Sequence, residues 1–226
     1  MFRLTDRSNL SHADAVLFGI GYATLIFTVG YYVTGLHDAF RTGFAIEDGP
    51  AEWGTAVCLM LSSLVLLRNA WVLRGRGVLA VAMTVLYALA FFFAAGEEIS
   101  WGYRLLDWEA TEFFRENNAQ GETNIHNLVV GDVKLVKTLF GGGLSLVMLL
   151  YLLVLPLVYG RVGALARLVD RLAIPVADTR HVILALVATV VIVAVQMMTK
   201  WESYEFVFSL LTVSIFLRPR NAAKVT

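Results

Sequence analysis

The chain has 226 residues, of which 58% are hydrophobic, and its mean hydropathy is +0.70. Soluble globular domains are about 45–50% apolar, so this composition excludes an ordinary soluble protein and is typical of a polytopic membrane protein. The eighteen basic and eighteen acidic residues cancel, and the single cysteine, Cys58, excludes an internal disulfide or a cysteine metal cluster.

Six apolar segments predict an all-α bundle of about six transmembrane helices, forming a single membrane domain over residues 1–226. A crossing needs about twenty residues, so six crossings leave room only for connecting loops. The polar N-terminal residues precede a full-length span, which predicts a retained anchor rather than a cleaved signal peptide. The predicted spans are residues 15–36, 51–67, 78–95, 136–159, 181–199 and 204–217.

Basic residues gather on one side of the predicted bundle. If the spans alternate, the N-terminus, the loops 68–77 and 160–180, and the C-terminus share one face, with twelve of the eighteen basic residues and four of the acids. The positive-inside rule then predicts that both termini lie in the cytoplasm. Because these basic residues are a topology signal, we expect membrane lipid around the chain and no nucleic-acid partner.

The opposite, periplasmic face carries most of the aromatic and acidic residues between the spans. Trp53, Trp101, Trp108 and Trp201 fall there, as an interfacial aromatic belt requires. Residues 108–117 place aromatic side chains among acids, which predicts a short interfacial helix between the third and fourth spans.

Two adjacent carboxylates, Glu97 and Glu98, follow the third apolar segment. They lie near a predicted helix C-terminus, where the helix dipole disfavours anions, and they repel each other. If the helix continues to Leu106, Trp101 and Arg104 follow Glu97 at i+4 and i+7 on one face. An ion pair with Arg104 is therefore the structural alternative to a functional role for this pair.

Other acids on the periplasmic face have a simpler interpretation. Glu202 and Glu205 stand at the outward N-terminus of the sixth span, where a carboxylate is favourable by about 0.3–1 kcal/mol. Helix capping and solvation explain such residues, although both could also complete a coordination shell.

A second polar cluster lies in the run GETNIHNL, residues 121–128. If this run is helical, Glu122 and His126 stand at i and i+4, and Asn124 and Asn127 at i and i+3. Four side chains that can bind a metal or a proton then lie within six residues, which makes the cluster a candidate site rather than a lone structural histidine.

The side chains on this face favour oxygen ligands. A site with three histidines cannot be built there, and the two Glu-x-x-His elements of a di-iron bundle do not occur. One divalent cation, Mg²⁺, Ca²⁺, Mn²⁺ or a mixed-ligand Zn²⁺, suits the set. Metal-free acid–base catalysis by Glu97, Glu98 and His126 suits it equally. The candidate metal ligands are Glu98, Glu122, Asn124, His126, Glu202 and Glu205, and the candidate substrate-binding residues are Trp101, Arg104 and Asn127.

The two polar runs together resemble a motif of uncharacterised bacterial polytopic inner-membrane proteins, in which Glu-Glu-x-Ser-Trp-Gly precedes Glu-x-Asn-x-His-Asn. The resemblance is close over residues 96–128 and extends loosely to the six-span layout. It implies a family and a membrane location, and it implies no particular activity.

Three functions remain open at this point. The first is a membrane-embedded enzyme that acts on a lipid or lipid-linked substrate in an acidic periplasmic pocket. The second is a non-catalytic subunit or assembly factor whose segment 97–127 docks a protein partner or a second copy of the chain. The third is a cation or proton-coupled transporter, but ion paths usually carry charged groups at mid-depth. No Asp, Glu, Lys or Arg occurs in residues 15–36, 54–67, 78–95, 138–159 and 182–199. An approach of Glu98, or alternatively Glu97, to within about 3–6 Å of His126 would favour a single site.

Overall fold

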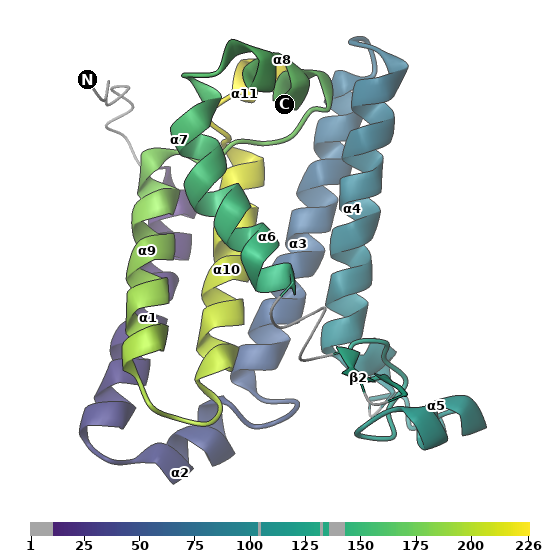
Figure 1. Ribbon diagram of the computed structural model, residues 1–226, viewed down its shortest axis with the longest axis vertical. Coiled ribbons are helices and arrows are strands. Elements are labelled where there is room, and N and C mark those ends of the chain that lie inside the picture. Colours follow the sequence, from purple (N-terminus) through teal and green to yellow (C-terminus); the bar gives the residue numbers. More distant parts are fainter. Residues whose placement is uncertain (1–10, 104, 132, 136–142) are drawn as a thin grey trace.

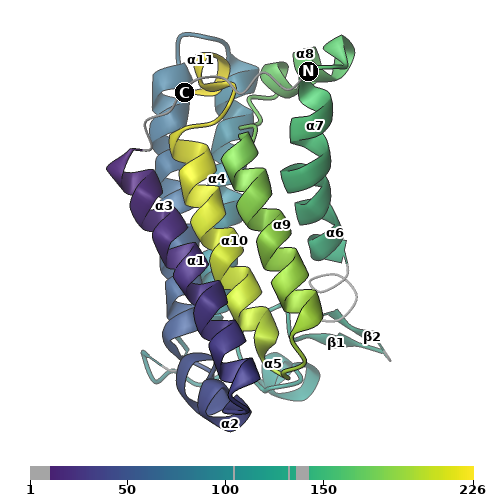
Figure 2. The ribbon, with the colours of Figure 1, turned by 90° about the vertical axis from the view of Figure 1, so that its left-hand side faces the viewer.

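The computed structural model describes residues 11–103, 105–131, 133–135 and 143–226, and these residues form a mostly helical fold with almost no strand (Figure 1). The all-α prediction is therefore confirmed. Five long helices run along the main axis of the molecule, and Figure 2 shows α10 between α1 and α9. Their bounds are α1 (His12–Val33), α3 (Pro50–Leu73), α4 (Val78–Glu98), α9 (Thr179–Ala194) and α10 (Lys200–Leu217).

Three of these helices, α1, α3 and α4, are long and apolar enough to cross a membrane. α4 is the most apolar of them, with a hydropathy of 2.4, and only 17% of its apolar window is buried inside the fold. A helix that is apolar on its outer face as well as its inner face suits a lipid environment. These helices support a membrane location, while Leu144–Tyr159 and Thr179–Ala194 are shorter apolar helical segments.

The helix ends differ from the predicted spans because local capping and burial set them. Ser11 caps α1 by accepting a hydrogen bond from the backbone N–H of Asp14 at 3.1 Å. α3 begins at Pro50 but runs past Arg68 to Leu73, since the buried Asn69 donates its side-chain amide to the Phe216 carbonyl at 2.9 Å. α9 ends at Ala194, five residues before the predicted end, and α10 begins four residues before its predicted start.

Short elements connect the long helices. The fourth predicted span is described only from Gly143 onward, and residues 136–142 lie outside the described part of the chain. The predicted interfacial helix is shorter than expected, since it begins at Glu112 rather than 108. The short elements are α2 (His37–Ala39), η1 (Phe40–Phe44), η2 (Ser100–Gly102), α5 (Glu112–Asn117), β1 (Val129–Val130), β2 (Val133–Lys134), α6 (Leu144–Leu149), η4 (Leu150–Val154), α7 (Leu155–Tyr159), α8 (Gly163–Arg171) and α11 (Ala222–Val225).

α10 is the central helix of the bundle, and nearly all of its residues from Ser203 onward are buried. It packs against α1, α3 and α9 through apolar side chains such as Leu211 and Ile215. Hydroxyl pairs join it to its neighbours, with Ser203 and Thr28 2.7 Å apart and Thr212 and Ser62 2.8 Å apart. Such small polar contacts are typical of helix packing in membranes.

A buried ionic network joins three helices at the end opposite α5. Asp14 on α1 is fully buried and accepts a hydrogen bond from the Ser214 hydroxyl on α10 at 2.7 Å. Arg180 and Arg218 each approach the same carboxylate to 3.3 Å. His181 on α9 contacts the Ser214 hydroxyl at 2.9 Å. The network therefore fixes the relative positions of α1, α9 and α10 at this end.

Candidate functional site

α4 ends at Glu98, and the chain then makes a left-handed turn instead of continuing helically to Leu106. Ser100, Trp101 and Gly102 have φ values of +46°, +56° and +73°. A non-glycine residue at positive φ is uncommon and persists where surrounding contacts fix it. The turn folds the Trp101 ring back over Gly96, where an added Cβ would lie 2.7 Å from the ring.

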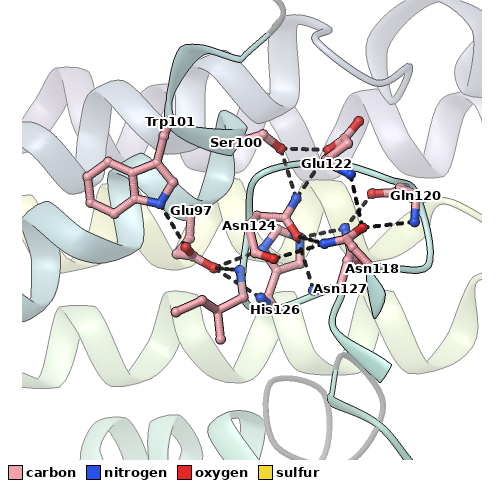
Figure 3. A network of polar contacts seen from close by, with 10 residues as sticks. Glu97, Ser100, Trp101, Asn118, Gln120, Glu122, Asn124, His126 and Asn127 are labelled. Atoms are coloured by element: carbon pink, nitrogen blue, oxygen red, sulfur yellow. Dashed lines mark hydrogen bonds and ion pairs between the residues drawn. The ribbon is translucent and has the colours of Figure 1, made fainter. Parts of the chain in front are cut away.

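Glu97 is the polar anchor of this turn, and its side chain is enclosed by hydrogen-bond donors (Figure 3). One carboxylate oxygen accepts the Trp101 indole N–H at 2.8 Å. The other accepts the backbone N–H groups of Ile125 at 2.6 Å and His126 at 3.0 Å. The His126 ring nitrogen Nδ1 lies 3.6 Å from the same oxygen. These donors compensate the unfavourable position of an anion at a helix C-terminus.

Ser100 makes the second attachment between the end of α4 and the distant loop. Its hydroxyl donates to the Glu122 carboxylate at 2.6 Å and accepts from the Asn124 side-chain amide at 2.8 Å. The Asn124 amide also reaches Glu122 at 3.1 Å. Glu122 and Asn124 are buried, so their polar atoms serve this internal network.

Asparagine side chains complete the fold of the loop itself. Asn118 donates to both oxygen atoms of Asn124 at 2.8 Å and accepts from the backbone N–H groups of Gln120 and Glu122. Asn127 donates to the Gln120 side-chain oxygen and lies 3.0 Å from the His126 ring nitrogen Nε2. Residues 118–128 therefore form a compact loop, so Glu122 and His126 do not stand one helical turn apart.

Glu98 belongs to a different group of side chains. Its carboxylate converges with those of Glu202 and Glu205 on the first turns of α10, and one oxygen of each lies within 4.8 Å of the others. Glu98 and Glu202 are half-buried and Glu205 is exposed. No hydrogen bond or ion pair to these three carboxylates occurs within the part of the chain that the structure describes. We call this group the carboxylate triad.

Further charges surround the carboxylate triad. Glu52, in the first turn of α3, adds a negative charge within electrostatic range of all three members. His126 lies within electrostatic range of Glu202. Glu202 and Glu205 on α10 lie close to Glu98 on α4. Capping of α10 alone therefore does not explain the positions of these two carboxylates.

The structure thus divides the residues that the sequence singled out into two groups. Glu97, Trp101, Glu122, Asn124, His126 and Asn127 take part in the loop network, whereas Glu98, Glu202 and Glu205 form the triad. The expected approach of His126 is made to Glu97 rather than to Glu98. Arg104 lies outside the described residues.

Sequence reasoning missed three members of the loop network, Ser100, Asn118 and Gln120. The run Asn-Asn-Ala-Gln-Gly at residues 117–121 indicates a turn, because asparagine and glycine are both common turn residues. Ser100 gave no such signal, since its role depends on contacts with residues more than twenty positions away.

Comparison with protein-family models, with curated proteins and with solved structures found no match to this chain.

Proposed function

We propose that the protein is a six-helix bacterial inner-membrane protein that binds a divalent cation at its periplasmic face through the carboxylate triad. The observation that carries this proposal is the convergence of Glu98, Glu202 and Glu205. They come from two helices more than a hundred residues apart in the sequence, and their oxygens lie within 4.8 Å of one another.

The electrostatics of the triad favour a bound cation. At about 5 Å and an effective dielectric constant of about 20, each pair of negative charges repels by about 3 kcal/mol. A divalent cation between the oxygens replaces this repulsion with attraction. Carboxylate oxygens without nitrogen or sulfur ligands are the set that Mg²⁺, Ca²⁺ and Mn²⁺ prefer. Zn²⁺, which the sequence left open, would need a nitrogen ligand such as His126, and that ring is already beside Glu97.

The arrangement of helices supports the six-span part of the proposal. The three shorter or more polar segments, Leu144–Tyr159, α9 and α10, run alongside the three long apolar helices (Figures 1 and 2). The triad and α5 lie at one end of the bundle, and the arginine-rich loops lie at the other. The positive-inside rule then assigns the arginine-rich end to the cytoplasm and the triad to the periplasm.

In the enzyme hypothesis, the carboxylate triad replaces Glu97 as the candidate catalytic group. Glu97 already accepts three N–H donors, which makes it a poor general base. A cation on the triad would instead act as a Lewis acid on the phosphate of a lipid or lipid-linked substrate. Glu205, the exposed member, is then the carboxylate best placed to meet a substrate.

One observation favours a second candidate function, docking of a protein partner. The segment between η2 and the loop network exposes large apolar side chains and projects from the end of the bundle (Figure 1). Leu105, Leu106, Trp108 and Phe113 are all exposed, and α5 is only six residues long. A non-catalytic subunit or assembly factor would use this surface. The transporter hypothesis has less support, because residues 15–36, 54–67, 78–95 and 182–199 contain none of the charged groups that ion paths usually carry.

The cation proposal is tested with the full-length protein purified in detergent, using Mn²⁺ as the probe and electron paramagnetic resonance to measure free Mn²⁺. We expect one saturable site, with binding lost in the Glu98→Gln/Glu205→Gln double variant. Glu116→Gln, an exposed acid on α5 outside the triad, is the matched control and should bind normally.

Thermal unfolding supplies a second measurement of the same site. A ligand at a hundred times its dissociation constant stabilises a protein by about 2.7 kcal/mol, so Mn²⁺ should raise the melting temperature of the wild type and of Glu116→Gln only. Equal Mn²⁺ binding by the wild type and the double variant would refute the proposal. Absence of binding in the wild type would instead favour protonated carboxylates or the docking function.

A further inference from the structure

A pocket of about 730 Å³ lies at the opposite end of the molecule from the carboxylate triad. It is an open depression bordered by the turn between α3 and α4, the end of α8, and α11, which lie together in Figure 1. Its size is within the range of about 300–1,000 Å³ that small-molecule sites occupy. We call it the basic pocket, and its lining includes Arg76, Val78, Leu79, Asp170, Arg171 and Lys224.

Hydrogen bonds and apolar contacts join the three segments that line the basic pocket. Arg76 donates a hydrogen bond to the Ala223 carbonyl on α11 at 2.6 Å. Asn221, just before α11, donates to the Asp170 carboxylate on α8 at 3.1 Å. Val225 is buried against Leu73 at the end of α3. The pocket is therefore preformed by three separate parts of the chain.

The charges in the basic pocket favour an anion. Arg76, Arg171 and Lys224 supply three positive charges against one carboxylate, Asp170. That carboxylate is already engaged, because one of its oxygens accepts the Tyr159 hydroxyl at 2.7 Å and the Asn221 amide. An anionic group in the pocket would meet a net charge of about +2.

An apolar surface continues from the basic pocket along the membrane-facing side of the bundle. Val78 is 86% exposed and Leu79 is 43% exposed, and both begin α4, which is the least buried of the three long apolar helices. α8 crosses this end of the bundle with Leu168 exposed and Val169 buried, which suits a helix at the membrane interface. A ligand with an anionic head and an apolar tail fits this combination, whereas free phosphate would use only the head site.

We propose that the basic pocket binds the phosphate headgroup of an anionic phospholipid, whose acyl chains lie along the start of α4. This inference depends on the membrane location of the chain and is independent of cation binding at the triad. In the proposed topology the site lies in the cytoplasmic leaflet, where anionic lipids attract basic residues.

The test uses the full-length protein, stripped of lipid in detergent, and native mass spectrometry with phosphatidylglycerol or phosphatidylcholine of the same acyl chains. We expect phosphatidylglycerol to be retained in preference. Arg171→Gln and Lys224→Gln should each weaken retention about fivefold, the effect of removing one interfacial positive charge. Both side chains are exposed, so either variant alone keeps the test valid if the other fails to fold. Arg167→Gln, one turn away on α8 and outside the pocket lining, is the matched control and should have no effect.

Three results would overturn the inference. Equal retention of the two lipids would show that the negative charge is not recognised. A loss in Arg167→Gln equal to that in Arg171→Gln would show diffuse attraction rather than a site. Displacement of phosphatidylglycerol by millimolar inorganic phosphate at equal potency would identify a free-phosphate site. Mn²⁺ binding at the triad should be unchanged in all of these variants, which separates failure here from failure of the proposed function.

Discussion

Glu97 and Glu98 are adjacent in the sequence, yet their side chains have opposite surroundings. Successive residues of a helix point about 100° apart, so one carboxylate turns toward the loop and the other toward α10. Glu97 is 5% exposed and accepts three N–H donors, while Glu98 faces two further carboxylates. The pair thus combines a structural residue with a candidate ligand.

Glu97→Gln should destabilise the loop network, because the Trp101 indole and two backbone N–H groups lose a charged acceptor. Hydrogen bonds to charged groups contribute about 1.5–3 kcal/mol each, so we expect a lower melting temperature and faster proteolysis near residues 105–117. Glu98→Gln is the control and should leave stability unchanged or raise it, since it removes repulsion within the triad. Equal destabilisation by the two variants would contradict these separate roles.

Gly96 should be intolerant of substitution because the Trp101 ring covers it. A Cβ at this position would lie 2.7 Å from the ring, so Gly96→Ala must displace the indole and its hydrogen bond to Glu97. Overpacking of this kind costs about 1–3 kcal/mol, and tryptophan fluorescence with thermal unfolding would measure it. Gly19→Ala on α1, where nothing lies within 4 Å of the added Cβ, should be neutral. A neutral Gly96→Ala would mean that the ring does not pack there.

At the scale of helices, the sequence predicted the long apolar helices and left their ends and partners open. Apolar runs identified α1, α3 and α4, because the periodicity and length of a helix are local properties. The end of α4 could not be predicted, since the left-handed turn is fixed by contacts with residues near 125. The same contacts explain why Glu97, and not Glu98, meets His126. The assembly of the triad depends on the packing of α4 near α10, which no local pattern records.

The buried ionic network between α1, α9 and α10 should contribute strongly to stability. Asp14→Ala would leave Arg180 and Arg218 without their shared carboxylate, and breaking a buried pair in this way costs about 3–5 kcal/mol. Chemical or thermal unfolding in detergent would measure the loss. Asp38→Ala removes an exposed partner of Arg41 and should have no measurable effect. If Asp14→Ala were equally silent, the ionic network would not be needed to hold α1, and its apolar packing and the Thr28–Ser203 contact would be sufficient.

At the scale of the whole molecule, the two ends carry opposite chemistry. The carboxylate triad stands at one end, and the basic pocket and the arginine network stand at the other. This polarity agrees with the charge asymmetry of the sequence, which is the basis of the proposed orientation in the membrane.

Reporter fusions test that orientation directly. α3 continues to Leu73, so the fusion points should be Gly75 in the turn after α3 and Gln120 in the loop network. We expect a cytoplasmic signal from the first and a periplasmic signal from the second. The same signal from both would refute the proposed topology, while the helical fold would stand.

The attachment of the end of α4 to residues 122–126 closes a ring of chain that contains α5. Hydrogen bonds between Glu97 and residue 125 and between Ser100 and residue 122 close this ring without a covalent bond. The part of the chain after the ring is also held to the part before it, because α10 packs against α1 and α3. The polypeptide could therefore be interrupted on the exposed side of the ring, near α5, without separating its halves. Two fragments encoded by separate genes and divided at that point should find each other in the membrane and rebuild one bundle.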